Sequence, residues 1–281
     1  MKIVIDLTIV RETNKITGIE RVAIETLKSL LTNRYANFKY HIICSKKGYV
    51  YIKRIIESIV QSPNDIEVFQ SPFENRIITD QIWMPNIIKK ISPDYVYYTT
   101  LGVPFLQRFP FSIIVHDVVA WVMPDTISKG MKYYYKPLIE KALKNKKNTN
   151  IVTVSSFSKK SIVEELGVKE DKIVVNYLGI SSNFIEKENT YNPNEVLGEY
   201  GISKEYIIAL GTIEPRKNIE GAIKAFAIMK EKYNYKGQLV IVGREGWIKN
   251  FNISESIASE IVITGFVSDQ DLPIILSQSK A

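Results

Sequence analysis

The sequence is poor in cysteine and histidine, and both shortages exclude kinds of site. Cys44 is the only cysteine, so no disulfide forms within the chain, and the apolar run around it predicts a packed, unreactive thiol. The chain has only two histidines, and no cluster of acids or histidines has the spacing of a metal site. We therefore expect no bound metal and, by default, a reducing cytoplasmic location.

Long apolar runs and common nucleotide-binding fingerprints are absent as well. No stretch has the apolar length that crossing a bilayer requires. The N-terminal sequence MKIVIDLTIV lacks a basic lead-in and contains Asp6, so it predicts a buried strand rather than a signal peptide. Neither G-x-G-x-x-G after a strand nor a Walker A sequence occurs, which argues against a dinucleotide dehydrogenase and a P-loop enzyme.

Positive charge is what the chain has in excess, +7 on an ordinary globular composition with 45% hydrophobic and 24% charged residues. This charge suits nucleic acid, an anionic membrane face or a phosphate-bearing substrate, and scattered lysines also serve simply to solubilise a surface. Segment 128–147 combines seven Lys and one Glu with three interleaved tyrosines. It predicts either contact with an anionic membrane or an ordinary surface helix.

Short β-branched runs alternate with helical segments in residues 1–180, which predicts an α/β domain with a parallel sheet. The predicted strands are 2–7, 39–45, 66–69, 94–98, 112–116, 150–154 and 172–177. The clearest predicted helices are 19–32, 49–60, 128–144 and 156–166. Together they make a complete doubly wound domain.

Polar residues without periodicity fill 181–203, so we interpret this segment as a linker. A second α/β series follows in 204–281. Its predicted strands are 206–210, 238–242 and 261–264, and its predicted helices are 219–233 and 269–277. Because a doubly wound domain needs about five or six strands, we expect the second sheet to be unfinished where the sequence stops.

Segment 211–218, GTIEPRKN, joins a predicted strand to a predicted helix and is the first candidate binding site. Gly211 permits a tight exit from the strand and Thr212 follows it. Arg216 and Lys217 come just before the helix, whose free N–H groups and positive dipole end attract phosphate. Ligands bind at the carboxyl ends of strands in open α/β sheets. That position favours a diphosphate clamp over a solvated basic turn.

Three other positions have competing interpretations. His116 closes a predicted strand, where a neutral imidazole can hydrogen-bond a sugar hydroxyl or shuttle a proton, or be a satisfied core histidine. Gly18 opens the first helix and either lets a phosphate approach closely or acts as a simple cap. Asp269 and Asp271 match an acid-x-acid metal motif superficially, but we assign Ser268 or Asp269 to a helix N-cap and Asp271 to the first turn.

Several segments together resemble the family-4 retaining glycosyltransferases of GT-B architecture, in order and spacing across nearly the whole chain. The similar segments are 18–21 (GIER), 116–117 (HD), 152–158 (VTVSSFS), 176–180 (NYLGI), 211–218 (GTIEPRKN), 242–247 (VGREGW) and 264–268 (TGFVS). The resemblance implies an α/β fold of two Rossmann-like domains facing across a cleft, the first for the acceptor and the second for a nucleotide sugar.

The resemblance also implies roles for single residues. His116 would contact the transferred sugar, and the loop at Gly18 would approach the donor phosphates and the acceptor. Lys217 would neutralise the leaving diphosphate without a metal, which is where most transition-state stabilisation should arise. The diphosphate site would comprise Gly18, Gly211, Thr212, Arg216 and Lys217. The nucleotide base would be met by Gly243, Arg244, Phe266 and Val267.

The sequence departs from the family pattern at two places. Thr212 stands where many relatives have arginine, and Arg216 in the EPRKN motif would supply that charge. Relatives continue with a strand and a loop bearing two glutamates that grip the donor sugar and ribose, whereas this sequence stops at Ala281. We therefore expect a chain truncated in its second domain.

The leading hypothesis is a metal-independent retaining hexosyltransferase, with GDP-mannose favoured over UDP- or dTDP-sugars. The acceptor would be a lipid-linked or growing surface glycan at the cytoplasmic face of the membrane, with peripheral contact through 128–147 and no nucleic-acid partner. One alternative is a truncated, inactive fragment that binds acceptor or a partner only. Another is a sugar-nucleotide or glycan-binding protein without catalysis.

Overall fold

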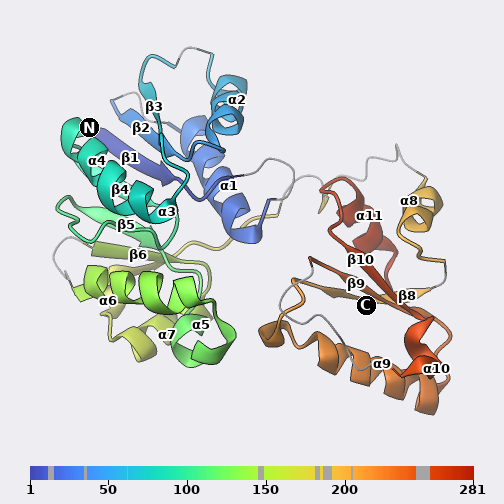
Figure 1. The fold of residues 1–281 in the computed structure, drawn as a ribbon. Helices are drawn as coiled ribbons and strands as arrows, with labels where there is room; N and C mark the ends of the chain where they lie inside the picture. The colour runs from blue at the N-terminus through green and yellow to red at the C-terminus, as the bar shows by residue number, and fades with distance from the viewer. Residues whose placement is uncertain are drawn as a thin grey trace. The chain divides into compact units, whose positions relative to one another are not determined.

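The computed structural model of the chain divides into two compact units, Met1–Leu178 and Gly179–Ala281, the first ending close to the predicted domain limit at residue 180 (Figure 1). The residues described are 1–11, 16–34, 37–61, 63–144, 149–180, 184–185, 192–203, 205–244 and 254–281. Each unit is an α/β layered structure, as the alternating sequence pattern predicted. In the described part of the chain, no helix is long and apolar enough to cross a membrane.

Unit 1 is built on a seven-stranded parallel sheet with the order β3-β2-β1-β4-β5-β6-β7. Its strands are β1 (Lys2–Leu7), β2 (Lys39–Cys44), β3 (Ile66–Gln70), β4 (Tyr95–Tyr98), β5 (Phe111–Ile114), β6 (Thr149–Thr153) and β7 (Ile173–Val175). All seven predicted strands are confirmed, with ends shifted by up to two residues. The order reverses between β1 and β4, and ligands of open α/β sheets bind at such a switch point.

The helical segments of unit 1 cover the sheet on both faces. They are α1 (Gly18–Thr32), α2 (Tyr49–Ile59), α3 (Arg76–Ile78), the π-helical turn η1 (Thr79–Trp83), α4 (Met84–Ile91), α5 (Val119–Val122), η2 (Pro124–Thr126), η3 (Met131–Tyr135), α6 (Lys136–Lys144), α7 (Ser156–Leu166) and η4 (Glu170–Lys172). The predicted helix over 128–144 is present as η3 followed by α6.

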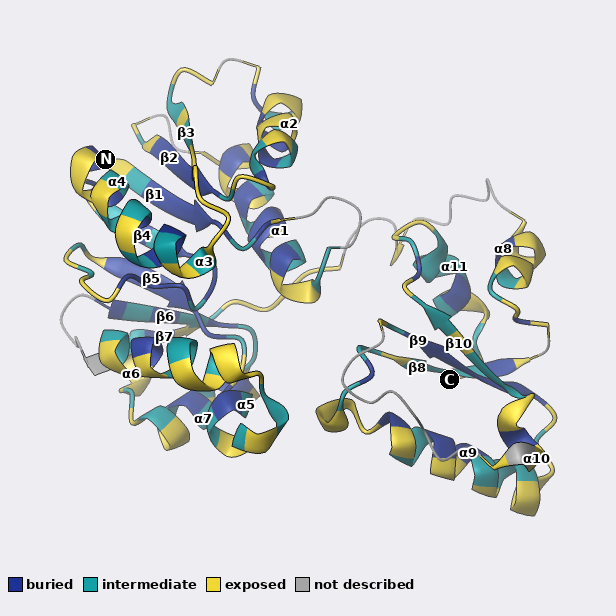
Figure 2. Cartoon of the chain, viewed as in Figure 1, coloured by how far each residue is buried: buried dark blue, intermediate teal, exposed yellow. Residues whose placement is uncertain are grey.

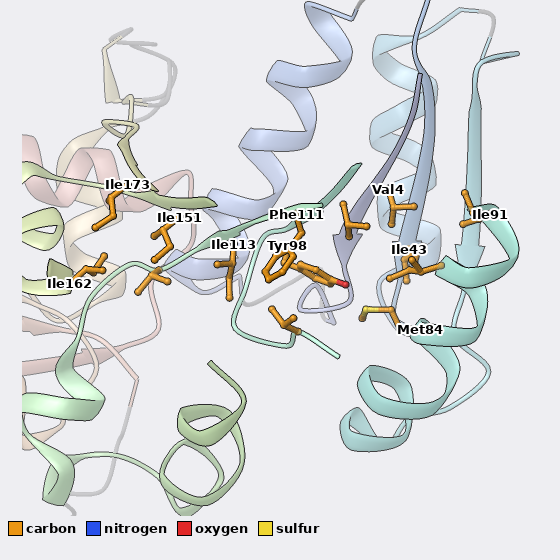
Figure 3. Packing of buried hydrophobic residues seen from close by; sticks show 14 of the residues in the cluster. Val4, Ile43, Met84, Ile91, Tyr98, Phe111, Ile113, Ile151, Ile162 and Ile173 are labelled. Carbon is orange, nitrogen blue, oxygen red and sulfur yellow. The ribbon is translucent and has the colours of Figure 1, made fainter. Parts of the chain in front are cut away.

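Alternate side chains of each strand enter different hydrophobic clusters, because successive residues of a strand point to opposite faces. Ile5 and Leu7 of β1 pack with α1 and α2, whereas Val4 packs on the other face with Met84 of α4. Figure 3 shows this second cluster running from Val4 to Ile162 of α7. Burial of both faces agrees with the mostly buried central strands β1, β2 and β5 of this sheet (Figure 2).

One helical region was absent from the predicted helices. Residues 76–91 form the continuous run α3–η1–α4, which includes Pro85. Proline normally signals the end of a helix, but Pro85 occupies the first turn of α4. A π-helical turn precedes that position, so regular helical spacing breaks and the sequence pattern is obscured.

Unit 2 contains a three-stranded parallel sheet with the order β10-β9-β8. The strands are β8 (Tyr206–Leu210), β9 (Gln238–Val242) and β10 (Ile261–Gly265). The helical segments are α8 (Pro193–Glu199), η6 (Pro215–Lys217), α9 (Ile219–Tyr233), α10 (Glu255–Ala258) and α11 (Asp271–Gln278). Leu239 and Ile241 pack against α9, while Val240 and Val242 pack with α8 and α11. The three predicted strands of this unit are confirmed.

Two ends of unit 2 add detail to the predicted organisation. Helix α8 lies within the segment predicted as a linker, and its Val196 is buried in the core of this unit. At the other end, the N–H of Lys280 donates to the carbonyl of Tyr206 at 2.9 Å, and the N–H of Ile208 donates to that of Ala281 at 2.8 Å. The last residues therefore pair with the edge of β8 that β9 leaves free.

Candidate functional site

Three glycines lie side by side at the carboxyl ends of the strands of unit 2. Gly211 follows β8, Gly243 follows β9, and Gly265 ends β10. The N–H of Gly211 donates to Val242 O at 2.8 Å, and the N–H of Gly243 donates to Gly265 O at 3.0 Å. A Cβ on Gly243 would lie 1.9 Å from the carbonyl oxygen of Gly211, so no other residue fits there. These three positions carry no side chains, so a ligand can approach the backbone of this edge closely.

The side chain of Lys217 lies across Gly211. A Cβ on Gly211 would meet the Cγ, Cδ and Cε of Lys217 at 3.3–3.4 Å, so the lysine stem covers the face of the glycine. Lys217 is exposed, and no described carboxylate lies within ion-pair distance of its ammonium group. The structure thus brings these two predicted phosphate-binding residues together and leaves the ammonium charge available to an anion.

Arg216 is less free than its position in the sequence suggested. Its Nε lies 2.6 Å from Oε1 of Glu214, an ion pair whose angles do not make a hydrogen bond. The Glu214 side chain is only 12% exposed, so water screens this pair weakly. Glu214 offsets much of the Arg216 charge, and the net positive charge of the clamp is carried by Lys217. Sequence reasoning missed Glu214, although its place two residues before Arg216 was visible.

The clamp ends at the start of α9. Asn218 has a left-handed backbone with φ of 49°, which turns the chain out of η6 and into the helix. The side chain of Asn218, the N-cap residue, makes no hydrogen bond to the first N–H groups of α9. They therefore remain available, with the positive end of the helix dipole, beside Lys217. Thr212 also lies at this edge, since its backbone N would be 3.2 Å from a Cβ on Gly243.

The residues predicted to meet a nucleotide base lie at or beyond the ends of β9 and β10. Arg244 is exposed, and its carbonyl accepts the N–H of Ile213 at 3.0 Å. Phe266 is 37% exposed, whereas the Val267 side chain is 5% exposed and packs in the core with Ile275. Val267 as a whole residue is therefore buried, and of these two residues only Phe266 is exposed. The other residues of the VGREGW segment, 245–247, lie outside the described residues.

Asp271 lies in the first turn of α11, as predicted, but the predicted N-cap at Ser268 or Asp269 is wrong, because the N-cap residue is Gln270. Ser268 Oγ accepts the N–H of Asp271 at 3.1 Å and donates to its carboxylate at 2.7 Å. The hydroxyl of Tyr200 donates to the same carboxylate at 2.8 Å. The carboxylate of Asp271 is thus used at the start of α11. Across the described ranges, no group of three or more His, Cys, Asp or Glu side chains is placed to hold a metal ion.

His116 follows β5, at the carboxyl edge of the sheet of unit 1. Its Nε2 is buried and has no hydrogen-bond partner among the described residues, which is uncommon for a buried polar atom. Burial lowers the pKa of His116 below its ordinary value of 6.5, and Asp117 opposes that shift. The imidazole is therefore neutral near pH 7 and can accept or donate a hydrogen bond. His41, by contrast, lies within β2, with its Nδ1 3.3 Å from Glu67.

Gly18 opens α1 but does not cap it. The cap is Thr17, whose hydroxyl accepts the N–H of Glu20 at 3.3 Å, while the Glu20 carboxylate accepts the N–H of Thr17 at 2.8 Å. The simple-cap interpretation of Gly18 is therefore wrong. A Cβ on Gly18 would meet nothing within 4 Å, so packing does not require glycine there. The open space beside it is consistent with a ligand.

Two family patterns match the chain. The pattern described as Glycosyltransferase Family 4 matches residues 16–184, and the pattern described as Glycosyl transferases group 1 matches residues 199–281. Between them they cover most of both units.

Individual relatives agree with these patterns. O-antigen chain mannosyltransferase B of Escherichia coli is 29% identical over 59% of this chain and 44% of its own length. O-antigen chain mannosyltransferase RfbU of Salmonella typhimurium is 25% identical over 85% of this chain and 64% of its own length. The chain thus spans between two fifths and two thirds of the length of these relatives.

A solved structure shows the same fold. Anabaena HepE, crystallised with UDP-glucose, superposes with a TM-score of 0.62 at 15% identity, covering 99% of this chain and 72% of its own. At that identity the likeness concerns the fold alone. It supports the parallel α/β fold of each unit.

Proposed function

The chain belongs to glycosyltransferase family 4, and from that membership we propose that it binds a nucleotide sugar and transfers a hexose to a lipid-linked or growing surface glycan. The observation that carries this proposal is Lys217 lying across Gly211 at the bare carboxyl edge of unit 2. An ammonium group that no described carboxylate pairs, a helix N-terminus and backbone without side chains suit a diphosphate.

In the proposed reaction, Lys217 and the start of α9 stabilise the diphosphate as it leaves the sugar. Charge on the leaving group grows in the transition state, so a fixed cation there lowers the barrier without a metal. Gly211, Gly243 and Gly265 let the backbone approach the nucleotide. The exposed ring of Phe266 offers a face for the base.

We assign His116 to contact with the transferred sugar. Its unpartnered Nε2 supports this role, because a sugar hydroxyl would satisfy a nitrogen that the protein leaves without a partner. Gly18 is assigned to close approach of a phosphate, on the ground that its neighbourhood is open. The retaining outcome rests on family membership rather than on distances between these groups.

The names of the relatives favour mannose as the transferred sugar, and the GTIEPRKN wording favours GDP as the nucleotide. UDP-, dTDP- and ADP-sugars are the competing donors. A thermal-shift panel of all four nucleotide classes tests this, because a ligand that binds only the folded state raises its melting temperature. A clear shift with GDP-mannose is expected, and a shift with a UDP-sugar alone would contradict the assigned nucleotide.

The acceptor is proposed to lie at an anionic membrane surface that unit 1 contacts through segment 128–147. Tyr133 is 71% exposed and Lys132 lies 6.0 Å from its ring centroid. Lys141 Nζ is 2.9 Å from the ring centroid of Phe105, itself 56% exposed. Lysines beside exposed aromatic rings favour anionic headgroups. Residues 145–147 of this segment lie outside the described residues.

The competing hypothesis is a chain that binds donor, acceptor or a partner without turnover. It follows from the chain spanning 44% and 64% of its mannosyltransferase relatives. Sugar transfer or donor hydrolysis by the purified chain would exclude it. Donor binding without either reaction would favour it over the transferase.

A further inference from the structure

A small cationic pocket lies within unit 1, and none of its lining residues belongs to the sites assigned above. Its volume is about 90 Å³, enough for several water molecules. Thr8 follows β1, Ser45 follows β2, and Phe73 follows β3, so the pocket opens at the carboxyl ends of three adjacent strands. That is the edge at which open α/β sheets bind ligands.

Positive charge dominates the lining. Arg11, Lys46 and Lys47 contribute cations, whereas the charge of Arg76 is offset by its ion pair with Asp80. Among the described residues, Glu74 is the one acid that lines the pocket. Within the described residues, no carboxylate lies at ion-pair distance from Arg11, Lys46 or Lys47. Cationic residues that line a cavity favour an anionic occupant.

Arg76 is held rigidly at the wall of this pocket. Its Nε lies 3.0 and 2.8 Å from the two carboxylate oxygens of buried Asp80, and its Nη2 donates to Thr100 Oγ1 at 3.2 Å. A Cβ on Gly102 would lie 2.7 Å from Nη2, so the glycine makes room for the guanidinium group. A cation fixed in advance costs little to order when a ligand binds.

The hydroxyl groups of the lining hold the loops in place. Thr8 Oγ1 donates to Asp6 at 2.6 Å. Ser45 Oγ donates to the carbonyl of Val10 and accepts the N–H of Gly48 at 3.0 Å. Because these hydroxyls have partners in the protein, the cations are the groups free to select a ligand.

We propose that this pocket binds a phosphate group that carries an apolar chain, as the head of a lipid-linked acceptor does. The pocket has the charge for a phosphate, and Phe73, 41% exposed on its lining, offers apolar contact to a hydrocarbon next to that phosphate. The assignment to the acceptor rests on the proposed transferase function. The binding itself depends only on unit 1.

The test compares two double variants of the full chain, both in a Lys217→Ala background that removes the clamp of unit 2. One carries Lys46→Ala and Lys47→Ala. The control carries Lys89→Ala and Lys90→Ala, an equally exposed adjacent pair at the end of α4, which leads to the amino end of β4. Calorimetric titrations use farnesyl diphosphate, inorganic diphosphate and farnesol as probes.

Farnesyl diphosphate should bind the Lys46/Lys47 variant at least about 10-fold more weakly than the control, since charge-assisted contacts are lost. It should also bind the control more tightly than inorganic diphosphate does, and farnesol should not distinguish the variants. Equal farnesyl diphosphate affinity in both variants would refute binding in this pocket. Equal affinity of the control for farnesyl diphosphate and inorganic diphosphate would refute the proposal that the ligand carries an apolar chain.

The test of this pocket can be distinguished from the test of the donor site. Nucleotide binding is measured on chains that differ only at Lys217. The clamp assignment can therefore be refuted while the pocket is supported, or the pocket refuted while the clamp is supported. Matching melting temperatures for the two double variants show that both fold equally well.

Discussion

Replacing Lys217 by Ala is the sharpest test of the diphosphate clamp. The side chain is exposed, has no ion pair with a described carboxylate, and touches the protein mainly through its stem over Gly211. Its removal should therefore change the free energy of unfolding by no more than about 0.5 kcal/mol. Any large loss of nucleotide binding would then reflect a lost contact to the ligand.

The expected loss follows from the chemistry of one charged hydrogen bond. Such a bond contributes about 1.5–3 kcal/mol, which corresponds to a Kd about 10- to 150-fold higher. Because Glu214 offsets Arg216, the arginine should not compensate for the missing lysine. Lys217→Met retains the stem over Gly211 and should lose affinity to the same extent, which separates charge from packing.

Isothermal titration with GDP at two salt concentrations measures this effect. Lys224→Ala is the matched control, because Lys224 is also exposed, lies on α9, and pairs only with Glu220 at 3.0 Å. The parent and the control should show the same Kd, and their affinity should fall with salt more steeply than that of Lys217→Ala. A Lys217→Ala Kd within twofold of the parent would refute the clamp.

Four further predictions concern other parts of the site. Glu214→Gln releases the neighbouring arginine, so GDP should bind about 3- to 10-fold more tightly at low salt by titration, and weaker binding would show that Glu214 positions the loop instead. His116→Gln should slow sugar transfer about 100-fold and leave the Kd for GDP, which lacks the transferred sugar, unchanged, and equal transfer rates would contradict this assignment. Burial lowers the pKa of His116 in the folded chain, so below about pH 6.5 the unfolded state binds more protons and the free energy of unfolding decreases as the pH falls. In denaturant titrations, this decrease should be smaller for His116→Gln than for the parent. Gly243→Ala places a Cβ 1.9 Å from Gly211 O and should destabilise unit 2 by at least about 1–3 kcal/mol in thermal unfolding, whereas Gly18→Ala, with open space around it, should not.

Secondary structure was largely predictable because each element has its own local signal. The strand at 206–210 and the helix at 219–233 were predicted with the bounds that the structure shows. The helical run at 76–91 and α8 were missed, because Pro85 interrupts the first and the second is short and polar. Their formation depends on packing, such as that of Met84 in the core, which no local pattern reports.

The candidate site was predictable in position but not in charge. Strand ends identified His116 and the loop at Gly211, since a strand's carboxyl end can be located from sequence. Which cations remain free could not be predicted, because it depends on side-chain contacts. Glu214 pairs with Arg216 and leaves Lys217 without an acid among the described residues.

The sequence by itself therefore determined the α/β class, the order of strands and helices, and the family resemblance, all of which arise from residues near one another in the chain. Only the tertiary structure decided that Gly243 must be glycine, because the carbonyl that excludes a Cβ belongs to Gly211, on the neighbouring strand. It also decided the pocket in unit 1, where Lys46 and Arg76 meet although they are far apart in sequence. The pairing of parallel strands brings together strand ends that are far apart in the sequence. No local sequence pattern reports which strands pair.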